Sequence, residues 1–320
     1  MTSLKPWRSV QEQLEILKRR GLQVGNDAAA LNYLRRIGYY RLSGYWYPLR
    51  VIDKAASERE RKPVRLDEFV PDSRFEDVVK LYVFDKKLRL LAMDALERIE
   101  MAVRVDVAHL LGKVDPCAHE NPDCLHGRFT KQKISKGKDR GRTGHEVWLE
   151  KYRQLLDRSR RLPFVAHHRE TYGGRLPIWV AIEVWDFGLL SRFFAGMCHS
   201  DQQTIALRYG AQDGRTFAGW LRSLNFMRNV AAHHSRMWNI NVLEVAPVPS
   251  GWPHMPNAKP FLYFCLMQKL LQTICPNSSW GQRLLALLRE EFPALPPAAA
   301  PLEDIGLCQR WGEWDLWVRR

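Results

Sequence analysis

The sequence runs from Phe75 to Leu111 without a proline or a glycine. Within this stretch, apolar residues recur at steps of three and four, at Val78, Leu81, Leu88, Leu91, Ala95, Ile99 and Ala102. Side chains with this spacing return to one face of an α-helix, so the stretch predicts one or two long helices that end at Gly112. The helical period dominates the rest of the chain as well, and no strong alternating strand pattern is present. We therefore expect an all-α fold.

Further helices are predicted at 145–161, 261–274 and 281–292. The stretch after Pro177, "IWVAIEVWDFGLLSRFF", is apolar nearly all round and predicts a central buried helix. It contains Glu183 and Asp186, and a buried carboxylate must be paired or protonated. Arg104 and Arg228 are the expected partners.

The balance of charge is unusual for a chain of ordinary hydrophobicity. A formal net charge of +14 and a pI near 9.7 favour a polyanionic partner, and nucleic acid before a membrane surface. The alternative is that the excess charge only solvates the surface. The N-terminal residues lack the apolar run of a signal peptide or anchor, and no later stretch could span a membrane, so we expect a cytoplasmic protein without a membrane partner.

The six cysteines have irregular spacings, which fit reduced thiols better than a disulfide framework. Four of the residues in "CAHENPDCLH" could ligate zinc, namely Cys117, His119, Cys124 and His126. A loop this short would have difficulty wrapping a tetrahedral ion, and neighbouring prolines favour a plain surface loop. We therefore expect no metal and no cofactor.

Two other segments leave alternatives open. The stretch 128–142, "RFTKQKISKGKDRGR", carries seven basic residues and one acidic residue and predicts a mobile basic loop. It is either a solvated insertion or an arm that tracks phosphates through Lys131, Lys133, Lys136 and Lys138. Near the C-terminus, Trp311, Trp314 and Trp317 lie three residues apart, and such a stripe more often packs against the protein body or a second protomer than stacks on bases.

Candidate catalytic residues lie in "LRSLNFMRNVAAHHSRMWN", residues 221–239. On a helix, Asn229 and His233 share a face one turn apart, and the Arg228 side chain is long enough to reach the same ligand. Arginine matches phosphate oxygens, and histidine exchanges protons near neutral pH. His234 is a second choice, and Arg236 is a further RNA-binding candidate. On residue types alone, structural roles in a helical bundle are favoured: Arg228 as a cap or ion-pair partner, Asn229 at a helix end and His233 as a core histidine.

Four stretches resemble one family. "RNVAAHHSRMWN" is similar to the Arg-x4-6-His motif of HEPN nucleases, in the form found in Abi-family abortive-infection proteins of the AbiD/AbiF type. Three more stretches resemble that family, at 37–50 ("IGYYRLSGYWYPLR"), 84–104 ("FDKKLRLLAMDALERIEMAVR") and 177–194 ("PIWVAIEVWDFGLLSRFF").

The resemblance implies a HEPN-like helical bundle with a basic loop insertion and a helical C-terminal extension. The expected domains are an N-terminal helical segment (1–70), the HEPN-like core (71–250, with the insertion near 113–145) and the extension (251–320). It also implies a metal-independent endoribonuclease of phage defence in which Arg228, Asn229 and His233 act in a homodimeric composite site. A regulatory small RNA or antitoxin-like partner is a further expectation, and the alternative function is a catalytically silent RNA-binding or partner-regulated module.

Overall fold

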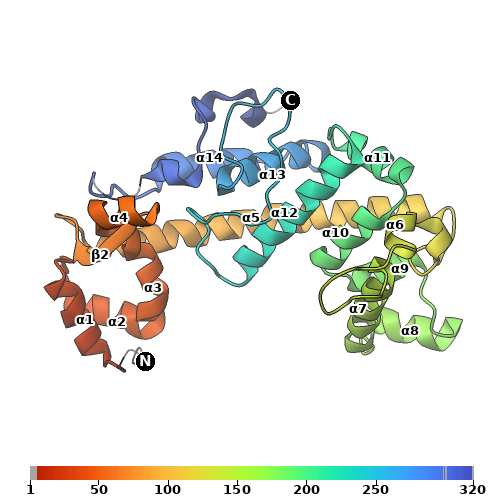
Figure 1. The fold of residues 1–320 in the computed structure, drawn as a ribbon, viewed down its shortest axis with the longest axis horizontal. Coiled ribbons are helices and arrows are strands. Elements are labelled where there is room, and N and C mark those ends of the chain that lie inside the picture. The colour runs from red at the N-terminus through yellow and green to blue at the C-terminus, as the bar shows by residue number, and fades with distance from the viewer. Residues whose placement is uncertain (1–5, 298, 300, 319–320) are drawn as a thin grey trace.

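The computed structural model describes residues 6–297, 299 and 301–318. Its central element is α5 (Phe75–Gly112), a single helix of 38 residues, which corresponds to a length of about 57 Å at the usual rise per residue. Figure 1 shows that α5 runs along most of the molecule. The long helix predicted from the apolar period is therefore confirmed, and its end at Gly112 is confirmed as well.

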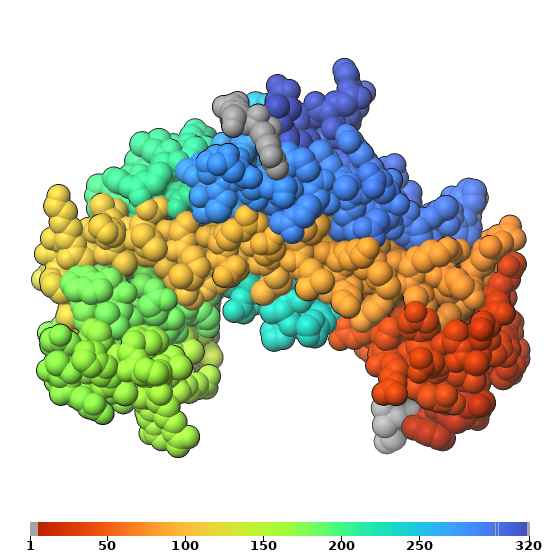
Figure 2. Space-filling model, turned by 180° about the vertical axis from the view of Figure 1, so that it is seen from behind, coloured from red at the N-terminus to blue at the C-terminus, as the bar shows by residue number. Residues whose placement is uncertain are grey.

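The remaining chain is arranged around α5 as an arch with two legs (Figures 1 and 2). The first leg consists of α1 (Val10–Arg19), α2 (Asp27–Arg36), α3 (Tyr39–Trp46), β1 (Arg50–Asp53), α4 (Lys54–Glu60) and β2 (Val64–Phe69). The second leg consists of α6 (Gly127–Thr130), α7 (Gly144–Arg158), α8 (Pro163–Tyr172) and α9 (Ile178–Ala181).

Three further helices pack against α5 near the second leg and the middle of the arch. They are α10 (Phe187–Gly196), α11 (His199–Arg208) and α12 (Gly214–Ala232). The end of α12 and the loop after it project into the hollow under the arch (Figures 1 and 2). On the side of α5 away from the legs lie α13 (Pro260–Ile274) and α14 (Trp280–Glu290). These two helices correspond to those predicted at 261–274 and 281–292.

The all-α fold is confirmed, with one small departure. β1 and β2 form a two-stranded antiparallel sheet that the sequence analysis missed, because strands of four and six residues are too short for a clear alternating pattern. Buried apolar residues from Leu14 to Trp317 form one continuous core, so all parts of the chain share it. The division of the chain into three domains stays a prediction.

The prediction of one buried helix over 177–194 is wrong. The chain forms α9, a short 3-10 turn (Ile182–Val184) and then α10, with an extended residue at Trp185. The break occurs because the Asp186 carboxylate accepts the backbone N–H of Leu189 at 2.7 Å and so caps a new helix. Glu183 and Asp186 are both exposed, and neither needs a buried partner.

The C-terminal tryptophans pack against the protein body, as expected. Trp317 is buried and lies against Phe261, Trp311 contacts the same ring, and Trp314 packs edge-on against Trp252. Their packing closes the core above α13. None of the helices in the described part of the chain is long and apolar enough to cross a lipid bilayer.

Candidate nuclease site under the arch

The candidate motif lies at the C-terminal end of α12. Asp213 caps the start of the helix, since its carboxylate accepts the N–H of Thr216, and the last helical residue is Ala232. His233 is the capping residue and His234 follows it with a left-handed backbone (φ 57°). The N–H of His234 donates to the carbonyl of Ala231 and that of Ser235 donates to Val230, which is the Schellman pattern.

This helix end exposes both imidazoles. His233 and His234 are solvent-exposed, whereas Arg228 and Asn229 are half-buried one turn earlier. The N–H of His233 donates to the carbonyl of Asn229 at 3.0 Å, so the two residues remain one turn apart, as the helical spacing predicts. His234 occupies a position that usually holds glycine, because a left-handed backbone disfavours a Cβ atom.

A buried ionic network holds the turn that follows the two histidines. Asp85 on α5 is fully buried, and its carboxylate accepts the backbone N–H groups of Met237 and Trp238 at 3.0 and 2.8 Å. It also accepts the hydroxyl of Tyr45 at 2.7 Å and forms an ion pair with Arg89. Burial raises the pKa of Asp85, and the guanidinium and the three other donors oppose that shift.

Helix α3 fastens the same turn from the first leg. Arg41 donates to the carbonyl of His234, and Arg236 donates to the carbonyl of Gly44. Burial lowers the pKa of the half-buried Arg236. Arg236 thus has a structural contact in this chain, and its predicted RNA contact stays a prediction.

On the side of the second leg, Arg228 lies beside a carboxylate on α5. Its guanidinium donates to the amide oxygen of Asn229 at 3.4 Å and acts electrostatically on Glu100. Burial raises the pKa of Glu100, and the attraction of Arg104 and Arg228 opposes the rise. Arg104 pairs with Glu100 at 2.6 Å and donates to the carbonyl of Trp185. The expected pairing of Glu183 or Asp186 with these arginines is therefore wrong for the residues described.

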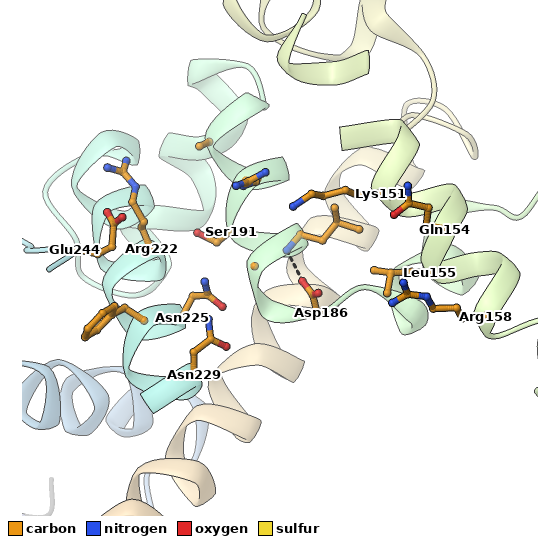
Figure 3. Close-up of a pocket in the computed structure, with 15 residues that line it drawn as sticks. Lys151, Gln154, Leu155, Arg158, Asp186, Ser191, Arg222, Asn225, Asn229 and Glu244 are labelled. Carbon is orange, nitrogen blue, oxygen red and sulfur yellow. Dashed lines mark hydrogen bonds between the residues drawn. The ribbon is translucent and has the colours of Figure 1, made fainter. Parts of the chain in front are cut away.

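A pocket of about 630 Å³ adjoins Asn229 between α7, α10 and α12. Figure 3 shows Lys151, Gln154 and Arg158 on one wall facing Arg222, Asn225 and Asn229 on the other. A second hollow of about 680 Å³ lies on the other side of the α12 end and is lined in part by Arg41, Arg89 and His234. The segment from Asn229 to His234, at the C-terminal end of α12, thus lies between two hollows.

The basic loop is more ordered than the sequence suggests. The N–H of Ile134 donates to the carbonyl of Arg142 at 2.8 Å and that of Gly141 donates back to Ile134, which forms a hairpin-like turn. The side chains of the four candidate lysines are exposed, and Lys133 pairs with Glu146 at 3.2 Å. Whether Lys131, Lys133, Lys136 and Lys138 bind RNA stays a prediction.

The four candidate zinc ligands do not converge. His119 is buried among Trp148, Tyr152 and Trp185, whereas the Nδ1 atom of His126 accepts the N–H of Arg128 and so caps α6. Among the residues that the structure describes, no three His, Cys, Asp or Glu side chains could hold a metal together. The plain surface loop is also wrong in part, because His119 lies in the core. All six cysteines are free thiols.

Comparison with known protein families assigns the chain to a family. The model of the Abi-like protein family matches residues 32–239, roughly two thirds of the chain. The chain belongs to the Abi-like protein family. Membership indicates a role in abortive-infection phage defence. Comparisons with curated proteins and with solved structures gave no match.

The family match covers all four stretches that the sequence analysis singled out, and hydrogen bonds in this Abi-like protein connect all four, three of them in one network. Residues of α3, Asp85 and Arg89 of α5, and the turn after α12 share one hydrogen-bond network. The fourth stretch meets α5 through the Trp185 carbonyl and Arg104. Sequence reasoning missed Tyr45, Asp85 and Arg89 as residues that position the site, although an isolated Asp in an apolar helical period could have marked one of them.

Proposed function

We propose that this Abi-like protein is a metal-independent endoribonuclease of the HEPN type. The observation that carries the proposal is the end of α12, where the half-buried Arg228 and Asn229 lie five and four residues before the exposed His233. The turn that follows is held by the buried Asp85–Arg89 pair. Two exposed imidazoles on a backbone so firmly held suit a catalytic role, because reacting groups must keep a defined geometry. The net charge of +14 favours an RNA substrate.

The reaction uses the nucleophile that RNA already contains. A neutral imidazole takes the proton of a 2'-hydroxyl, whose oxygen attacks the adjacent phosphorus, and the bond from phosphorus to the 5'-oxygen breaks. A protonated imidazole gives its proton to the leaving oxygen. The products are a 2',3'-cyclic phosphate and a 5'-hydroxyl. Arg228 stabilises the phosphorane charge, and Asn229 orients the phosphate or the imidazole.

One imidazole cannot easily serve as base and acid in the same turnover. We therefore propose a homodimer in which His233 of each protomer faces the same phosphate in a composite site. Pairing wild-type protomers with the Arg228→Ala/His233→Ala double variant tests this arrangement. Independent sites leave such a heterodimer about half active, whereas a shared site loses far more, since acid or base catalysis contributes on the order of 10² to 10⁴ in rate.

The activity itself is tested with labelled RNA in excess chelator. Wild-type protein should cleave the RNA and leave 2',3'-cyclic phosphate ends, and Arg228→Ala and His233→Ala should abolish cleavage without changing the thermal melt. His234→Ala should have a milder effect. His254→Ala is the matched control, because His254 is exposed and lies outside the motif. Full activity of the His233→Ala protein would refute the assignment.

The second candidate function is a silent RNA-binding or partner-regulated defence module. The exposed lysines of the basic loop favour it, because they could bind RNA without any chemistry at α12. In that case RNA binds but is not cut, with or without chelator.

A further inference from the structure

The pocket between α7, α10 and α12 is lined by positively charged side chains that form no ion pair in the described part of the chain. Four cations line it, and they come from three different helices: Lys151, Arg158, Arg192 and Arg222. In the part of the chain that the structure describes, none of the four forms an ion pair, although arginines at other helix contacts do, such as Arg208 with Asp106. Unpaired cations of separate elements around one hollow favour an anionic ligand.

Carboxylates at the pocket do not cancel this charge. Asp186 and Glu244 are the two acidic residues in the lining, which leaves a formal excess of two positive charges. The Asp186 carboxylate is already engaged as the cap of α10, through the N–H of Leu189. Glu244 is exposed and lies beside Arg222 in Figure 3.

The rest of the wall suits a nucleobase. Phe226 and Leu155 line it with apolar surface. Figure 3 shows the amide side chains of Asn225 and Asn229 on the α12 wall, across the pocket from Leu155. A half-buried phenylalanine gives a face on which a base can stack, and an amide can pair with base edges. The pocket volume of about 630 Å³ lies within the usual range for small-ligand sites.

The pocket residues of α12 lie along the same helix face as two of the candidate catalytic residues, Asn229 and His233. Arg222, Asn225 and Asn229 are spaced by three and four residues, and the next step of four reaches His233. The distance along the axis from Arg222 to His233 is about 16 Å at the usual helical rise. Asn229 belongs to both the pocket and the motif, so a strand could pass from one to the other without a gap.

We infer that this pocket binds the single-stranded RNA segment next to the scissile phosphate, an inference that rests on the proposed ribonuclease function. The four cations bind backbone phosphates, Phe226 stacks on an unpaired base, and Asn225 contacts its edge. A base inside a duplex has both faces covered by its neighbours and cannot enter. The site therefore selects single strands and loops over duplex RNA.

A short 2'-O-methylated RNA oligonucleotide tests the site without cleavage, because it lacks the nucleophilic hydroxyl. Its affinity is measured by fluorescence anisotropy over a range of salt concentrations. Arg222→Ala and Arg158→Ala should each weaken binding about tenfold and lower the salt slope by about 0.7, because each variant neutralises one phosphate fewer. Phe226→Leu should weaken binding about tenfold with the slope unchanged.

Matched controls exist on the same helices. Arg215→Ala on α12 and Arg153→Ala on α7 remove exposed arginines that lie outside this pocket, and both should bind the probe like the wild type. Arg222 and Arg158 are also exposed, so their replacement should leave the thermal melt unchanged. Phe226→Leu is checked by its own melt, and the arginine variants decide the result if it unfolds.

The outcomes separate the pocket from the chemistry. If the pocket variants bind the probe like the wild type while His233→Ala still abolishes cleavage, the pocket assignment is wrong and the ribonuclease stands. If binding depends on the pocket but wild-type protein cuts no RNA, the ribonuclease is wrong and the binding site stands. Equal affinity for duplex RNA, or a free mononucleotide that binds as tightly as the oligonucleotide, would overturn the single-strand site.

Discussion

Replacing Asp85 with asparagine should destabilise the fold and disable the candidate site together. Asp85 is 0% exposed and its partner Arg89 is 5% exposed, so the variant leaves a buried guanidinium without a counter-charge. In the variant, the side-chain NH2 group of the asparagine would also face groups that donate to the carboxylate in the wild type, such as the backbone N–H groups of Met237 and Trp238. Breaking a buried pair from one side costs roughly 3–5 kcal/mol in the free energy of unfolding, a large part of the 5–15 kcal/mol typical of a folded protein.

Urea unfolding followed by circular dichroism measures that loss. Asp94→Asn is the control on the same helix, because Asp94 is only half-buried where it pairs with Arg98 and Arg283, and each such solvent-accessible pair should contribute less than about 1 kcal/mol. RNA cleavage is then measured well below the melting temperature of the variant, where activity should remain low because the turn from His234 to Trp238 has lost its main acceptor. An unfolding free energy within about 1 kcal/mol of wild type, or full cleavage, would refute this account.

Three shorter predictions concern other parts of the chain. His234→Gly should raise the free energy of unfolding by about 1 kcal/mol, because glycine accepts the left-handed backbone at φ 57°, and a drop in urea stability would contradict this. Burial lowers the pKa of His119 to about 4, so as the pH falls the unfolded chain binds a proton on this residue before the folded protein does. About 3 kcal/mol of the free energy of unfolding should therefore be lost between pH 6.5 and 4. His119→Phe should remove that loss, as measured by thermal melts at a series of pH values. Neutralising the basic-loop lysines should flatten the salt dependence of RNA binding, and an unchanged slope would make the loop solvated surface; these residues are Lys131, Lys133, Lys136 and Lys138.

The helices that the sequence predicts well are those with one apolar face. α5 could be located because its period of three and four continues without a breaker, and α13 and α14 start near a proline or serine turn. The stretch 178–194 is predicted wrongly because its apolar residues cover every face and give no period. The break signal is local, since an aspartate three residues before Leu189 is a typical helix cap.

The candidate site divides in the same way. Arg228, Asn229 and His233 are neighbours in the sequence, so helical spacing alone places them together. The end of α12 could not be located, because a histidine and not a glycine occupies its left-handed position. The support from Asp85 could not be predicted either, since Met237 and Trp238 lie about 150 residues away and only the tertiary fold joins them.

Because α5 is one unbroken helix, its length sets the orientation and the separation of the two legs. The first leg meets it through Tyr45 at Asp85, and the second through Ile178 and Trp179 at Gly112. One residue inserted between those points would turn one leg by about 100° relative to the other and shift it by about 1.5 Å, whereas seven residues would preserve the direction and widen the hollow by about 10 Å. Substitutions at exposed positions of α5 do not change the relative orientation of the legs. Any change in the length of α5 changes which surfaces of the two legs face each other on either side of the α12 end.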